Sequence, residues 1–175
     1  RLCSFMRFKD GTRIAPRRAD EIEVVTMTPD GRIVAFTIDE RFDVALRMVR
    51  RALALEGLRV PCEVDTAARV RQELGVGLKQ SVVLYVDDPI RLLEATVMNP
   101  AGGLFIPEPV VVSSVNQRSC RVSVRSIAPL FSSDLPASLR GAVTNLHERI
   151  LAAVQRVGQK HTAATEMIGY DFVPA

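Results

Sequence analysis

The stretch over residues 87–112 constrains the fold more than any other part of the chain. Asp88-Pro89 follows a continuous apolar run, and Asn99-Pro100 follows about ten largely apolar residues. An Asp side chain caps the free N–H groups at a helix start, and a Pro in the first turn has no N–H to satisfy. The residue before a Pro is biased away from helical backbone, so Asn99 marks a stop. The stretch therefore predicts a strand, a helix over 89–98, a glycine-containing turn and a second strand.

The rest of the chain alternates between strand and helix patterns. Apolar residues on a 3.6-residue period predict helices over about 42–56 and 135–157, and Gly57 suits a left-handed helix end. Alternating segments at 22–28 and 32–38 flank Pro29-Asp30-Gly31 and predict a hairpin. The other predicted elements are an edge strand containing Pro61, a short helix over 66–74, a buried strand over 81–86 and a hairpin of 110–115 with 120–127.

This order predicts a two-layer α+β sandwich, with a mainly antiparallel sheet covered on one face by helices. We expect a basic irregular segment over 1–20, one α+β domain over 21–158 and a C-terminal tail over 159–175. The domain is long enough to bury an ordinary core.

The composition bears on whether the chain is expected in a membrane, outside the cell or in the cytoplasm. The chain is 47% hydrophobic and 25% charged, and its apolar runs are far shorter than the ~20 residues of a membrane helix. Residues 1–20 lack the apolar centre of a secretory signal. Three widely spaced cysteines favour reduced thiols and a cytoplasmic location. We expect Cys62 and Cys120, both in strand-like segments, to be buried.

Positive charge is concentrated at the start of the chain. Residues 1–18 hold six basic side chains and one acidic one, Asp10. Such a segment can associate with nucleic acid through phosphate contacts. A solvated segment is the more common outcome, so nucleic acid is not the expected partner.

Residues suited to metal or nucleophilic chemistry are sparse. The two histidines, His147 and His161, have no neighbouring ligands at a zinc-site spacing, and His147 is expected on a solvated helix face. The serine pairs lack a nucleophile motif. The sequence predicts no metal, no cofactor and no assigned catalytic residue.

One polar group deserves a functional hypothesis. The group consists of Asp87 and Asp88 at the end of the apolar strand, Asn99 at the helix stop and Glu108 between two prolines, and it would line one mouth if the sheet brings the strand ends together. Carboxylates beside an apolar residue such as Phe105 can act as an acid and a base. The favoured alternative is structural: Asp88 caps, Asn99 stops, and Glu108 is exposed between two prolines.

The neighbouring turn completes the candidate binding site. Gly102 and Gly103 precede Leu104-Phe105-Ile106-Pro107, an apolar stretch that is either core or a contact surface. The candidate ligand-binding residues are Asp88, Asn99, Gly102, Gly103, Phe105 and Glu108.

Several segments carry a family resemblance. They are Ala-Leu-Glu-Gly-Leu-Arg-Val at 54–60, Glu-Val-Asp at 63–65, Arg-Gln-Glu-Leu-Gly-Val at 71–76 and Asn-Pro-Ala-Gly-Gly-Leu-Phe-Ile-Pro at 99–107. Over about 41–157 the chain resembles the domain-of-unknown-function 302 family. The resemblance implies a fold like that of the TATA-binding protein and a homodimer, and it implies no reaction. Family members often have Cys where this chain has Glu108, and Asn-Pro where it has Asp88-Pro89, so thiol chemistry is not expected.

Three functions follow as hypotheses. We favour a homodimeric module that binds a small molecule or a protein without catalysis of its own. The first alternative is a small-molecule enzyme that uses Asp88 and Glu108 as acid and base. The second is weak nucleic-acid association through the basic segment.

Overall fold

The computed structural model describes residues 33–128 and 136–161. The expected strand over 22–28, the basic segment over 1–20 and most of the expected tail lie outside the described residues. The elements are β1 (Ile33–Ile38), α1 (Phe42–Leu55), β2 (Arg59–Asp65), α2 (Thr66–Leu74), β3 (Ser81–Asp87), α3 (Pro89–Met98), the 3₁₀ helix η1 (Pro100–Leu104), β4 (Glu108–Asn116), β5 (Ser119–Arg125), α4 (Ala137–Gln155) and β6 (Gln159–His161).

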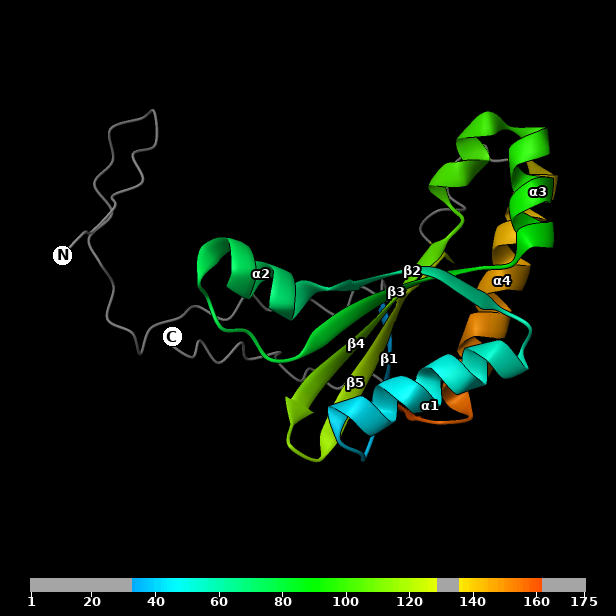
Figure 1. Ribbon diagram of the computed structural model, residues 1–175. Coiled ribbons are helices and arrows are strands. Elements are labelled where there is room, and N and C mark those ends of the chain that lie inside the picture. Colours follow the sequence, from blue (N-terminus) through cyan, green and yellow to red (C-terminus); the bar gives the residue numbers. More distant parts are fainter. Residues whose placement is uncertain (1–32, 129–135, 162–175) are drawn as a thin grey trace, which may run out of the picture.

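The strands form a six-stranded sheet in the order β2-β3-β4-β5-β1-β6. Every neighbouring pair is antiparallel, so the predicted α+β sandwich is confirmed. Short β6 pairs with β1, which places residues 159–161 in the sheet rather than in a tail. Figure 1 shows α1 and α4 together against the sheet, with α3 following β3 at one end and α2 preceding it at the other.

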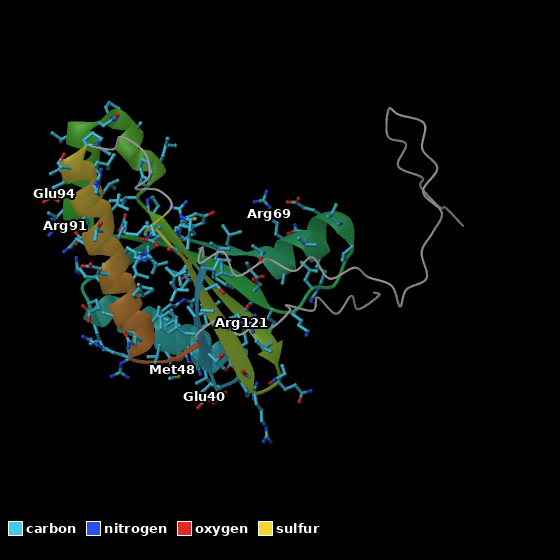
Figure 2. All side chains as sticks on the ribbon, turned by 180° about the vertical axis from the view of Figure 1, so that it is seen from behind. Glu40, Met48, Arg69, Arg91, Glu94 and Arg121 are labelled. Atoms are coloured by element: carbon cyan, nitrogen blue, oxygen red, sulfur yellow. The ribbon has the colours of Figure 1, made fainter. Side chains whose placement is uncertain are left out.

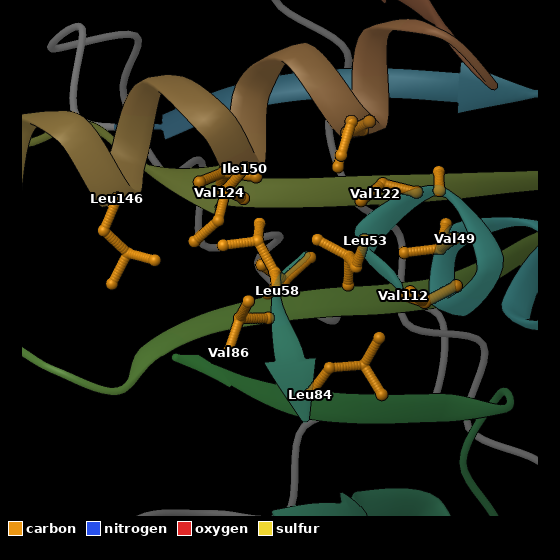
Figure 3. Close-up of a cluster of buried hydrophobic side chains, with 14 of the residues drawn as sticks. Val49, Leu53, Leu58, Leu84, Val86, Val112, Val122, Val124, Leu146 and Ile150 are labelled. Carbon is orange, nitrogen blue, oxygen red and sulfur yellow. The ribbon is translucent and has the colours of Figure 1, made fainter. Parts of the chain in front are cut away.

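One face of the sheet builds the core. Side chains of a strand alternate between two faces, and every second residue of the central strands is buried against α1 and α4. Leu53 of α1 and Leu146 and Ile150 of α4 are fully buried there. Figure 3 shows these side chains meeting the valines of β3, β4 and β5. This layer fixes α4 across the sheet.

Helix ends follow the local signals. Gly57 and Gly75 both adopt left-handed backbone conformations after α1 and α2, with φ of 70° and 68°. Asp65 caps α2 by accepting a 2.8 Å hydrogen bond from the Ala68 backbone N–H. The predicted end of α1 at Gly57 is thus confirmed, whereas α1 begins after Arg41 without a side-chain cap.

Strand β2 lies at the sheet edge, as Pro61 predicts. Its pairing with β3 shifts register between Arg59 and Cys62. Cys62 is exposed, so the expectation that it is buried was wrong, whereas Cys120 is buried as expected. An edge strand has a neighbouring strand on one side only, and no residue of β2 is fully buried.

Helix α2 is more exposed than its apolar residues predicted. Only Ala67 is buried, and Leu74 is 72% exposed. No helix in the described part of the chain combines the length and apolar character that a bilayer span needs.

Candidate functional site

The end of β3 carries two adjacent buried carboxyl groups, Asp87 and Asp88, which are 8% and 7% exposed. Successive side chains of a strand point to opposite faces, so the side chains of Asp87 and Asp88 point in different directions where β3 ends and α3 begins. The two groups therefore have different surroundings and different protonation behaviour.

Asp88 joins three elements. Its side chain caps α3 by accepting a 2.9 Å hydrogen bond from the Ile90 backbone N–H, and it forms an ion pair with Arg149 of α4. Arg149 also donates to the backbone carbonyl of Glu56 at the end of α1. Burial on its own raises the pKa of Asp88, but the hydrogen bonds from Arg149 and from the backbone of Ile90 and Arg91 outweigh it and hold the pKa below its usual value. Asp88 is therefore an ionised structural group at neutral pH.

Asp87 is poorly compensated. Its Oδ1 atom is buried without a hydrogen-bond partner. Burial raises the pKa of this carboxyl, Arg59 lowers it, and the negative charge of Asp88 raises it further. The net effect is a raised pKa, because loss of hydration disfavours the charged form.

Glu108 is the largest departure from the sequence interpretation. The expectation of an exposed Glu between two prolines was wrong: the residue is 1% exposed, and its Oε1 lies 2.7 Å from Nδ1 of His147. His147 was expected on a solvated helix face and is only 6% exposed. A carboxylate that accepts from one ring nitrogen fixes the orientation of the imidazole.

Two patterns in the sequence point to this pair. Glu108 has the same strand parity as Val110 and Val112, which are both fully buried. His147 comes four residues after Val143, within the buried stripe of α4. Extending each period by one step would have placed both residues in the interior.

Asp88 and Glu108 approach α4 separately. Their partners, Arg149 and His147, are two residues apart on the helix and thus point roughly 200° apart around its axis. This arrangement gives each carboxyl its own basic partner.

The turn after α3 is held tightly. Asn99 accepts a 2.9 Å hydrogen bond from the Ala101 backbone N–H and so caps η1. Gly102 is buried against α3, where an added Cβ would lie 2.3 Å from the Ala95 carbonyl oxygen. Gly103 is exposed and has no atom near such a position. Gly102 is therefore required for close packing, and Gly103 is not.

The apolar stretch after the glycines divides between core and surface. Ile106 is fully buried, and Phe105 is half-buried against the core. Leu104 is 80% exposed. The two interpretations offered from the sequence thus apply to different residues of the same turn.

Helix α3 exposes further apolar side chains. Its inner side holds buried Ala95, while Ile90, Leu93 and Val97 are 64%, 62% and 71% exposed. These three residues follow i, i+3, i+7 spacing and so form one stripe on the outer side. We call Ile90, Leu93, Val97 and Leu104 the α3 surface. The sequence interpretation missed it because an apolar helix next to a strand is normally assigned to the core.

A recess lies at the opposite end of β4. It is lined by the β1–α1 connection and the β4–β5 turn: Asp39, Glu40, Arg41, Phe42, Asp43, Gln80, Ser114, Asn116, Gln117 and Arg118. Glu108 and Asn116 bound β4 and are eight residues apart, about 26 Å along a strand. The recess therefore contains none of the predicted site residues. Over the described ranges, no three His, Cys, Asp or Glu side chains are grouped to hold a metal ion.

Comparisons with known proteins address the family. Residues 34–157 match the family described as "Domain of unknown function DUF302". No curated protein sequence matches the chain. The crystal structure of an uncharacterized conserved DUF302 protein from Bacillus stearothermophilus is similar, with a TM-score of 0.61 and 15% sequence identity over 71% of this chain and 97% of that one. At this identity the structural likeness supports the fold alone. Because the family match spans most of the chain, this protein belongs to the DUF302 family, a domain of unknown function.

Proposed function

We propose that the protein is a protein-binding module that self-associates through the α3 surface and has no catalytic role of its own. The exposed stripe of Ile90, Leu93 and Val97 carries the proposal. Exposed apolar groups are ordinary when they are scattered, but a contiguous set marks an interaction site.

The local charges favour an apolar contact. Glu94 lies next to the stripe and forms a 2.7 Å ion pair with Arg91 of the same helix, while Arg91 also donates to Asn145 of α4. Figure 2 shows Arg91 and Glu94 on α3 beside α4. The acidic charge next to the stripe is thus neutralised within the protomer, which lowers the cost of covering it.

The magnitude supports a weak to moderate dimer. Completing the burial of a side chain that is about two-thirds exposed is worth about 1–2 kcal/mol. Eight such side chains in a symmetric pair contribute roughly 8–16 kcal/mol, against an association cost of about 4–15 kcal/mol. A dissociation constant of micromolar order requires a net gain of about 8 kcal/mol, which lies within the difference between these two ranges.

The carboxyl geometry favours binding over acid–base catalysis. Asp88 is engaged by Arg149 and Ile90, and Glu108 is engaged by His147. A shared acid–base centre needs both groups directed at one substrate, whereas each of these groups has its own partner on α4.

Sedimentation equilibrium over a range of protein concentrations tests the proposal. The unaltered chain should reach the mass of a dimer, and Leu93→Lys should remain monomeric because a lysine ammonium cannot be buried in an apolar contact without a large cost. Leu74→Lys is the matched control, because Leu74 is similarly exposed but lies on α2. A monomer for the unaltered chain, or equal dimerisation of both variants, would contradict the proposal.

A further inference from the structure

The stripe on α3 is nearly symmetric along the helix. Ile90 and Val97 are both branched aliphatic residues at its two ends, and their midpoint falls between Leu93 and Glu94. At about 1.5 Å per residue, Leu93 lies within about 1 Å of that midpoint, and the two end residues lie about 5 Å from it on either side. A stripe with this symmetry is complementary to a reversed copy of itself.

The flanks of the stripe permit close approach. Pro89 and Thr96 border it on one side, and the Thr96 hydroxyl donates a 2.8 Å hydrogen bond to the Leu92 carbonyl oxygen, so this side carries no charge. Glu94, paired with Arg91, borders the other side. Small or neutralised flanks allow two helices to pack at the usual 8–10 Å separation.

A closed two-fold dimer would cover the exposed stripe of both protomers at once. An isologous contact uses the same patch on both subunits and leaves no second patch to cover. In the reversed arrangement, Ile90 of one protomer meets Val97 of its partner, and the two Leu93 side chains meet at the centre. A parallel arrangement would instead place each residue opposite its own copy.

We propose that two copies of the chain pair their α3 helices antiparallel across a two-fold axis beside Leu93. This inference rests on the proposed self-association and specifies its geometry. The contact covers both stripes completely, and the two-fold axis places the two Arg91–Glu94 pairs symmetrically on one face of the helix pair.

Cysteine cross-linking tests the geometry. The full chain with Cys3→Ser and Cys62→Ser provides the background, since Cys62 is exposed, and buried Cys120 is retained. In this background Leu93→Cys should form an inter-protomer disulfide under mild oxidation, at a yield several-fold above that of Leu74→Cys. A disulfide requires Cα atoms about 4.4–6.8 Å apart, which only residues near the axis satisfy with their own copies.

The end residues determine the direction of pairing. Ile90→Cys alone and Val97→Cys alone should cross-link no more than Leu74→Cys, because each residue lies about 10 Å along the axis from its own copy. An equal mixture of these two variants should form a mixed disulfide that joins one protomer of each variant. Efficient self-cross-linking of both single variants would indicate parallel helices and overturn the inference.

Failure of the geometry can be separated from failure of the function. If the background protein sediments as a dimer and Leu93→Cys fails to cross-link above the control, the antiparallel contact is wrong and the proposed self-association stands. If the background protein is a monomer, both proposals are wrong. Circular dichroism of each variant checks that the exposed substitutions leave the fold intact.

Discussion

Glu108 at the start of β4 and His147 in the middle of α4 form a buried hydrogen-bonded pair, with Oε1 2.7 Å from Nδ1. Their side chains are 2% and 8% exposed. The pair connects the sheet to its covering helix through two polar groups within an otherwise apolar layer. Neither group can lose its partner without leaving the other buried and uncompensated.

The first prediction concerns this coupling. His147→Leu and Glu108→Leu should each lower the free energy of unfolding by about 3 kcal/mol, because each leaves one buried polar group without a partner. The double variant should be more stable than the sum of the two losses implies, because it removes both groups together. Urea denaturation of all four proteins measures the coupling energy. Additive losses would show that the two side chains are energetically independent.

The second prediction concerns Asp88. Asp88→Ala should lower the free energy of unfolding by about 2–3 kcal/mol at pH 7, because it removes a helix cap and the ion pair with partly buried Arg149. Asp65→Ala should cost only about 1 kcal/mol, because Asp65 caps α2 through an exposed hydrogen bond. Chemical denaturation of both variants measures this difference.

The pH dependence of the same variant follows from linkage. The folded-state pKa of Asp88 lies below its usual value, so its ionised form stabilises the fold above the unfolded-state pKa of about 4. That stabilisation is lost as pH falls through the lowered folded-state pKa. The difference between Asp88→Ala and the unaltered protein should therefore shrink below about pH 4. A difference that stays constant down to pH 2 would contradict the assignment.

Much of the fold could be predicted from the sequence because its signals are local. The Asp88-Pro89 start of α3 and the left-handed glycines at 57 and 75 each depend on a few neighbouring residues. The spacing of the apolar residues in α1 likewise predicts which of its side chains are buried. The hydrophobic periodicity and the helix caps were therefore sufficient to predict the two layers and the antiparallel sheet.

The candidate site depends on contacts that are distant in sequence. Glu108 and His147 are 39 residues apart, and Asp88 and Arg149 are 61 residues apart. A single polar residue in an apolar pattern has no local feature that identifies its partner. The exposure of Leu93 was missed for a related reason: α3 packs against α4 rather than across the sheet, so only its inner side is covered.

The third prediction concerns Asp87, whose Oδ1 atom is buried without a partner. Its folded-state pKa is raised by burial, so the ionised form destabilises the fold. This penalty is absent at low pH, begins above the unfolded-state pKa of about 4 and is complete above the raised folded-state pKa. The stability of Asp87→Asn relative to the unaltered protein should therefore rise between pH 3.5 and pH 7, by on the order of 1 kcal/mol. Thermal unfolding across this range measures it, and a relative stability that is independent of pH would refute it.

The fourth prediction separates the two glycines of η1. Gly102→Ala should lower the free energy of unfolding by about 2 kcal/mol or more, because the new Cβ would meet the Ala95 carbonyl oxygen at 2.3 Å and force η1 away from α3. Gly103→Ala is the matched control, since the same added methyl meets no atom within 4 Å. It should be neutral or stabilise by up to about 1 kcal/mol through the unfolded state. Urea denaturation distinguishes the two variants, and equal stability would show that η1 moves freely on α3. Displacement of η1 also shifts Leu104, so Gly102→Ala should weaken self-association more than Gly103→Ala does.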